Sequence, residues 1–156
     1  MSFLANPPAP AATGEPTLQN DGWFPDIDLA QLRATARLDG TVTAERLRYS
    51  ALSAIASINS ELSTYKATQL VHGHANLAEV SGAQIGALPL QVVHYLRAVY
   101  SYTQADLIER YRDFDTTGAG DKAADKLELR TSDLRRDVRW AISDLLGIRR
   151  TTVELI

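Results

Sequence analysis

Acidic and hydroxyl side chains in the segment RDFDTTGAGDKAAD, residues 112–125, have the spacing of a calcium-binding loop. An EF-hand loop takes oxygen ligands at its positions 1, 3, 5 and 9, and has glycine at position 6. These positions are matched by Asp113, Asp115, Thr117, Asp121 and Gly118. The twelfth position requires a bidentate glutamate, and this chain has Ala124 there. We therefore expect a turn at Gly118–Gly120 between two helices, with Asp121 as N-cap of the second.

Histidine and serine side chains offer two further kinds of chemistry. His72 and His74 flank Gly73, and paired imidazoles are a common part of a zinc site. The chain has no cysteine, and no third ligand stands at a recognisable spacing, since His94 lies twenty residues beyond His74. No Gly-x-Ser-x-Gly motif marks a nucleophilic serine. The sequence thus predicts no cofactor, no metal site and no catalytic site.

The stretch DLRRDVRW, residues 133–140, is the most cationic part of the chain. Its arginines could contact the phosphates of DNA: Arg135, Arg136 and Arg139. Over residues 121–156, however, eight Lys and Arg face seven Asp and Glu, so the segment is mixed in sign. Arg136 can also stack on Trp140 one turn later. We expect a mainly structural role for this stretch, with weak and non-specific DNA contact at most.

The composition is that of an ordinary globular protein, because 45% of the 156 residues are hydrophobic and 22% are charged. The length suits one domain. A net charge of -3 argues against a protein whose main partner is nucleic acid. No apolar run reaches the roughly 18 residues of a membrane span, and the first residues lack the pattern of a secretory signal. We expect a protein that is cytosolic where it is made and has no membrane partner.

The two ends of the chain differ from its centre. Five of the six prolines fall within the first 25 residues, so residues 1–22 are predicted to form an extended arm. Residues 23–147 are predicted to form a helical domain. Residues 148–156 follow a glycine suited to ending a helix and are rich in β-branched side chains, which predicts an extended tail. A lone strand has no partner inside a helical bundle, so we expect the tail to bind another chain.

Four helices are expected within the domain. Asp28 caps the first, which stops at Gly40, and Thr43 caps the second, which runs to about residue 69. Residues 72–87 form a connector. The third helix is expected at about 88–114 and the fourth at 121–146. Long amphipathic helices joined by short turns predict an all-α helical bundle.

The third of these helices has an unusually wide apolar stripe. Its expected inner face consists of Val93, Leu96, Tyr100, Leu107, Tyr111 and Phe114. The neighbouring positions Val92, Tyr95, Val99 and Tyr102 widen the stripe beyond the needs of one helical partner. We expect this helix to contact more than one neighbour.

Once these segments are placed, the sequence resembles the head-completion protein family of peduovirus-type contractile-tailed phages. Four motifs carry the resemblance: WFPDID (23–28), ERYRDFD (109–115), GDKAAD (120–125) and RRDVRWAISDLLG (135–147). The likeness extends from about Trp23 to Ile156. It implies a virion protein without enzymatic activity, found at the head–tail junction and in the host cytoplasm during assembly.

The resemblance also implies a set of partners. Such proteins act after DNA packaging as head–tail connector adaptors that bind beneath the portal protein as a dodecameric ring, retain the genome and present a surface to the tail. Copies of itself, a tail-side connector or tail terminator protein, and the packaged DNA in the channel would then be its neighbours. On this view, ring neighbours cover the surplus apolar face of the third helix.

Two hypotheses assign residues to these contacts. The tail residues are expected to dock on the portal by strand addition: Thr151, Thr152, Val153, Glu154, Leu155 and Ile156. Trp23, Phe24 and Pro25 are expected to anchor the arm in a groove of the bundle or of a neighbouring subunit. Two alternatives stay open, a small helical nucleic-acid-binding regulator that uses the three arginines and a calcium- or zinc-binding protein.

Overall fold

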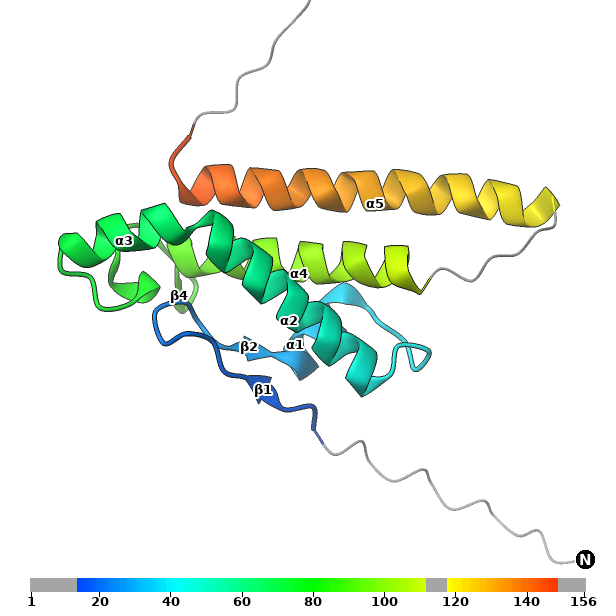
Figure 1. The fold of residues 1–156 in the computed structure, drawn as a ribbon, viewed down its shortest axis with the longest axis horizontal. Helices are drawn as coiled ribbons and strands as arrows, with labels where there is room; N and C mark the ends of the chain where they lie inside the picture. Colours follow the sequence, from blue (N-terminus) through cyan, green and yellow to red (C-terminus); the bar gives the residue numbers. More distant parts are fainter. Residues whose placement is uncertain (1–13, 112–117, 149–156) are drawn as a thin grey trace, which may run out of the picture.

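The computed structural model describes residues 14–111 and 118–148, with side chains at 14–111 and 128–148 (Figure 1). The described residues form five α-helices and a 3₁₀ turn: α1 (Leu29–Ala36), α2 (Ala44–Glu61), α3 (Ser63–Val71), η1 (Leu77–Glu79), α4 (Leu90–Arg110) and α5 (Gly118–Leu145). Two short hairpins complete the fold: β1 (Thr17–Leu18) with β2 (Ile27–Asp28), and β3 (Gln84–Ile85) with β4 (Leu88–Pro89). The predicted all-α bundle is confirmed. None of the described helices combines the length and apolar character that a membrane span needs.

Helix α4 is the central element of the bundle. It packs along α5 on one side and against α2 on the other, and α1 meets it at a third place (Figure 1). Its buried face is formed by Val92, Tyr95, Val99, Thr103 and Asp106. These residues recur at three- and four-residue spacing, as a buried helical stripe must.

The predicted inner face of this helix is therefore only partly right. Leu107 is buried as expected, but Val93, Leu96 and Tyr100 are half-buried. The buried stripe is centred on Val92, Tyr95 and Val99, which were expected only to widen it. The reason is that the positions of α2 and α5 together determine which face of α4 is buried. Tyr111 is 38% exposed, and Phe114 lies outside the described residues.

The first two helix starts follow their capping residues. The Asp28 side chain accepts a hydrogen bond from the Gln31 amide at 3.0 Å, and Thr43 Oγ1 accepts one from the Arg46 amide at 3.3 Å. Both caps were predicted, and both satisfy amides that have no partner inside the helix. The predicted stop of the first helix at Gly40 is wrong, because α1 ends at Ala36. Arg37 takes a left-handed conformation there, with φ of 52°, and its amide bonds back to the Ala34 carbonyl.

The predicted single helix from Thr43 to residue 69 is divided in two. Leu62 ends α2 and precedes α3, and its side chain is fully buried. The α2 face that contributes to the core consists of Leu47, Ala51, Ala54, Ile55 and Ile58, all of them buried. Helix α3 has no buried residue. The break thus keeps Leu62 in the core while the following helix continues along the surface.

Two other loop predictions need correction. The connector at 72–87 contains η1 and strand β3, and its Leu77 and Val80 are buried in the core. The predicted turn at Gly118–Gly120 is wrong, since α5 begins at Gly118, before the predicted cap Asp121. Glycine is costly in a helix interior, and these glycines occupy the first turn, where that cost is smaller. Asp113, Asp115 and Thr117 of the calcium-like segment lie outside the described residues.

The far end of α5 is closed by a Schellman motif, as the predicted stop at Gly147 required. Gly147 has φ of 69° and its amide bonds to the Asp144 carbonyl at 3.2 Å. The Ile148 amide bonds to the Ser143 carbonyl at 2.9 Å. These two bonds satisfy carbonyls that the helix itself leaves free.

The segment from Glu15 to Gly22 lies within the predicted arm, and it belongs to the folded domain. Strand β1 pairs with β2 so that Thr17 faces Asp28 and Leu18 faces Ile27, and Leu18 is buried. Arg33 binds both carboxylate oxygens of Glu15, with its Nε at 2.9 and 3.0 Å. The chain here is extended as expected, but it is held because Leu18 supplies an apolar side chain to the core. Residues 1–13 lie outside the described residues.

Candidate assembly surfaces

The aromatic residues Trp23 and Phe24 are buried within their own chain. Their rings meet edge to face at 4.8 Å between centroids, and Phe24 stacks on Tyr95 of α4 at the same distance. Trp23 Nε1 donates to the His74 carbonyl at 3.1 Å, and the Trp23 carbonyl accepts from the Leu77 amide at 2.9 Å. The start of the domain is thereby joined to α4 and to the segment after α3. No surface of Trp23 or Phe24 remains for a neighbouring subunit, since each is 4% exposed or less.

Asp21 holds the turn that leads into these aromatics. Its Oδ1 accepts from the amides of Trp23 and Phe24 at 3.0 Å each, and its Oδ2 pairs with Lys66 Nζ at 2.7 Å. Partial burial by itself would raise the pKa of Asp21. The Lys66 hydrogen bond and the two amides outweigh that effect, so the pKa lies below its ordinary value of 3.8. The charged carboxylate therefore connects α3 to the turn that contains Trp23 and Phe24.

A closed polar network lies beside the aromatic stack. Tyr95 Oη donates to Asn59 Oδ1 at 2.6 Å, Asn59 Nδ2 donates to Asn20 Oδ1 at 2.8 Å, and Asn20 Nδ2 donates to Tyr95 Oη at 2.8 Å. Burial raises the pKa of Tyr95, so its hydroxyl stays protonated and able to donate. This network was not predictable from local sequence patterns, because its members stand on separate segments far apart in the chain.

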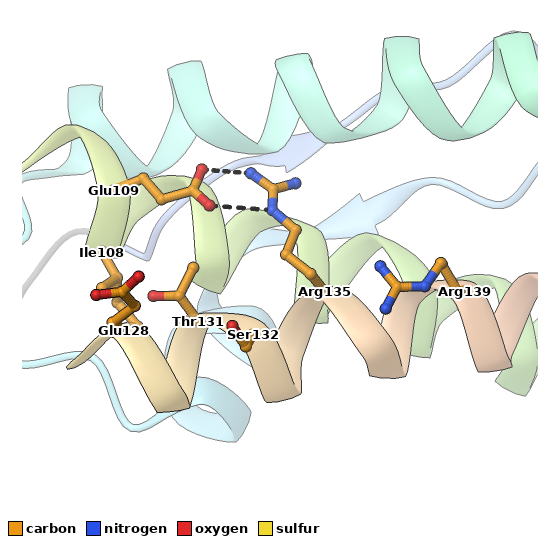
Figure 2. A pocket seen from close by; sticks show the side chains of 7 residues that line it. All are labelled: Ile108, Glu109, Glu128, Thr131, Ser132, Arg135 and Arg139. Atoms are coloured by element: carbon orange, nitrogen blue, oxygen red, sulfur yellow. Dashed lines mark hydrogen bonds and ion pairs between the residues drawn. The ribbon is translucent and has the colours of Figure 1, made fainter. Parts of the chain in front are cut away.

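A hollow on the surface lies between the end of α4 and the middle of α5 (Figure 2). It has a volume of about 410 Å³ and is lined by Ile108, Glu109, Glu128, Thr131, Ser132, Arg135 and Arg139. Figure 2 shows Arg135 reaching across from α5 to Glu109 of α4 through two hydrogen bonds. The lining is polar and carries both charges, so the hollow has no apolar pocket in which a small molecule would be held.

Arg135 is a structural clamp between helices. Its Nε donates to Glu109 Oε1 at 3.2 Å, and its guanidinium lies over the Tyr102 ring at 4.6 Å from the centroid. The Tyr102 hydroxyl accepts a hydrogen bond from Ser57 of α2 at 3.1 Å. The bonds to Glu109 raise the pKa of Arg135. The contacts of Tyr102 with Ser57 and with Arg135 therefore connect α2, α4 and α5.

The three candidate arginines do not form one cationic surface. Arg136 pairs with Asp133 at 2.9 Å and lies over the Trp140 ring at 4.8 Å, so the predicted stacking on Trp140 is confirmed. Arg139 is exposed and, within residues 14–111 and 128–148, makes no ion pair. The hollow that Arg139 lines also contains Glu109, Glu128 and Arg135, so the cation of Arg139 lies in a field of mixed sign.

The apolar surface expected on α4 is absent from that helix. No large apolar side chain of α4 is exposed, because α2 and α5 cover the wide stripe within one chain. The expectation that ring neighbours cover it is therefore wrong. Exposed large apolar side chains of the described residues lie instead on α2, α3, the β3–β4 hairpin, the C-cap of α4, the body of α5 and the residue after its Schellman glycine: Tyr49, Leu52, Leu70, Val71, Ile85, Leu88, Tyr111, Leu129 and Ile148.

Two other groups of candidate residues can be placed only in part. Residues 151–156, the expected docking tail, lie outside the described residues, and the tail follows Ile148, which is 57% exposed. His72 is exposed and the His74 carbonyl is used by Trp23. Among the residues that the structure describes, no three His, Asp or Glu side chains converge as metal ligands would.

Comparison with known proteins gives a consistent result. The sequence profile of phage head completion proteins (GPL) matches residues 18–156. The head completion/stabilization protein of Escherichia phage P2 is 38% identical over 149 residues, which cover 96% of this chain and 88% of that protein. No solved structure matches the chain significantly.

Proposed function

Since the chain belongs to the family of phage head completion proteins (GPL), we propose that it acts as an adaptor beneath the portal of the phage head. Its structural, virion-associated role in completing the head follows from that membership. The finer proposal is that copies form a ring on the portal after DNA packaging. The ring retains the genome and offers the tail its attachment surface.

The tail is the part of the chain that we assign to the portal. The Schellman motif at Gly147 ends α5, and Ile148, the next residue, is exposed. The following residues are rich in β-branched and apolar side chains. A short segment of this composition suits addition to the edge of a partner's sheet, where backbone bonds supply affinity and alternate side chains supply specificity.

Ring formation is supported by the distribution of apolar surface. The core of each subunit is complete without a neighbour, because α4 is covered on both sides within the chain. Tyr49 and Leu52 are exposed on α2, whereas Leu70 and Val71 are exposed on α3. Two distinct exposed apolar sites on one subunit suit a head-to-tail contact, which closes into a ring when the rotation between copies allows it.

A nucleic-acid-binding regulator is a weaker explanation of the same sequence. Arg135 and Arg136 are engaged by Glu109, Tyr102, Asp133 and Trp140, so Arg139 is the candidate arginine that remains available. One cation in a mixed field neutralises too few phosphates to support tight binding. Packaged DNA in the channel is therefore a non-specific neighbour in our proposal.

The proposal is tested by removing the tail. Deleting Thr151–Ile156 should leave the helical circular dichroism unchanged and abolish association with the portal protein. A full-length chain with Val153→Asp and Ile156→Asp should also fail to associate, and Thr152→Ser should associate normally. Normal portal association of the truncated chain would show that the tail assignment is wrong.

A further inference from the structure

An apolar groove of about 820 Å³ runs along α1 and the turn that joins it to α2. Its walls include Ala30 and Ala34, which are four residues apart and exposed on one face of α1. Leu38 and Val42 are half-buried and line it from the turn. Small and aliphatic side chains thus supply most of the groove's surface, and the charged side chains of Glu15, Arg33, Arg37 and Asp39 also line it.

The described part of the chain begins at this groove. Gly14 and Glu15 lie along its edge. Arg33 binds the Glu15 carboxylate with a bidentate contact and also donates to the Asp39 carbonyl at 3.0 Å. The point from which the first thirteen residues depart is therefore fixed beside the groove, within reach of its whole length.

The sequence of these thirteen residues matches the groove in character. MSFLANPPAPAAT has no charged side chain, and it contains Phe3, Leu4 and the prolines Pro7, Pro8 and Pro10. Proline-rich segments favour an extended conformation with little entropy left to lose, and they bind apolar grooves in that form. At about 3.1 Å per residue such a segment spans roughly 40 Å, more than enough to follow α1.

We propose that residues 1–13 bind in the α1 groove of their own chain. The tether at Glu15 favours the same chain over a second copy, since a short linker gives an effective concentration in the millimolar range. The groove then has a built-in occupant, and a partner that needs this face must displace it. This inference is independent of the portal proposal, because it concerns the opposite end of the chain from the docking tail.

A spin label tests the proposal in the full-length protein. The chain has no cysteine, so Ala9→Cys provides a single attachment site for a nitroxide. The label should broaden the NMR amide signals of Ala34 and Val42 and leave the signal of Ile85, in the β3–β4 hairpin away from α1, sharp (Figure 1). Ala34→Glu, which places a charge in the groove, should abolish this broadening.

A matched control separates groove binding from a general charge effect. Thr35→Glu adds the same charge to the next exposed position of α1, outside the groove, and should preserve the broadening. A mixture of nitroxide-bearing chain and isotope-labelled chain without nitroxide should show no broadening. Broadening in that mixture would assign the arm to a second copy and overturn the proposal. Absence of broadening in the single chain, or broadening that survives Ala34→Glu, would overturn it as well.

Discussion

The Phe24 ring stacks on the Tyr95 ring with 4.8 Å between centroids and 13° between planes. This contact joins the start of the domain to the central helix, and the Asn20–Asn59–Tyr95 network lies beside it. Aromatic stacking and satisfied, partly buried hydrogen bonds both require a defined geometry. The contact therefore locks the segment before α1 onto α4.

Trp23→Ala should lower the free energy of unfolding by about 3–5 kcal/mol, as large-to-small changes at buried aromatics do. The substitution removes the edge-to-face contacts with Phe24 and Tyr65 and leaves the His74 carbonyl without its donor. Urea unfolding measures the change, and protease cleavage near residue 25 should become faster. Tyr49→Ala, at a 58% exposed position, is the control and should have a much smaller effect. Equal losses for the two variants would contradict the anchoring role of Trp23.

Tyr95→Phe should lower the free energy of unfolding by about 1 kcal/mol, since it leaves a half-buried polar partner unsatisfied. Asn59 Oδ1 loses its donor, and Asn20 Nδ2 keeps the Pro25 carbonyl as its acceptor. Tyr100→Phe on the same helix removes a long, exposed bond to Gln31 and should be close to neutral. Thermal or urea unfolding of both variants tests this difference, and a neutral Tyr95→Phe would refute it.

Asp21 should contribute to the acid sensitivity of the protein. Its folded pKa lies below 3.8, so its contribution to stability is present above that value and is lost as pH falls through the folded pKa. Asp21→Asn keeps an oxygen for the Trp23 and Phe24 amides and removes the charge that faces Lys66. The effect should not exceed about 1 kcal/mol, because the pair is partly exposed to solvent.

Urea unfolding of the wild type and of Asp21→Asn at a series of pH values measures this contribution. The two curves should differ at neutral pH and converge in acid, below the folded pKa of Asp21. A constant difference across the series would show that the charge of Asp21 makes no contribution.

Arg135→Ala should destabilise the protein by about 1 kcal/mol, since it removes the Glu109 pair and the contact with Tyr102. Arg139→Ala should change the stability by less than about 0.5 kcal/mol, as a substitution at an exposed, unpaired position does. The same two variants also test which of the two arginines contributes to any DNA binding. A gel-shift titration against salt should assign what weak binding exists to Arg139, and a larger loss from Arg135→Ala would contradict this assignment.

Local signals in the sequence were sufficient for the helix ends at Asp28, Thr43 and Gly147, because capping depends on residues within one turn. The face of α4 was harder to predict. Val92 and Val93 are equally apolar, and the choice between their two stripes depends on where α2 and α5 lie. The division of the second helix at Leu62 likewise follows from tertiary packing, which overrides helix propensity.

The candidate sites were predictable to a similar extent. Aromatic residues beside a proline-rich arm led to the prediction of an anchor at Trp23–Pro25, and the structure shows Trp23 and Phe24 buried. The engagement of Arg135 by Glu109 was not, since the two residues are 26 positions apart and on different helices. The α1 groove was not predictable from the sequence, because Ala30 and Ala34 carry no signal as single residues. The groove forms only where the turn at Leu38 and Val42 lies opposite them.

Electron cryo-microscopy of the phage particle that contains this chain tests the central claim most directly. We expect a ring of density beneath the portal into which the α2–α4–α5 bundle fits, with residues after Ile148 continuing onto the portal. A particle in which this chain is absent from the vertex where head meets tail would contradict the account.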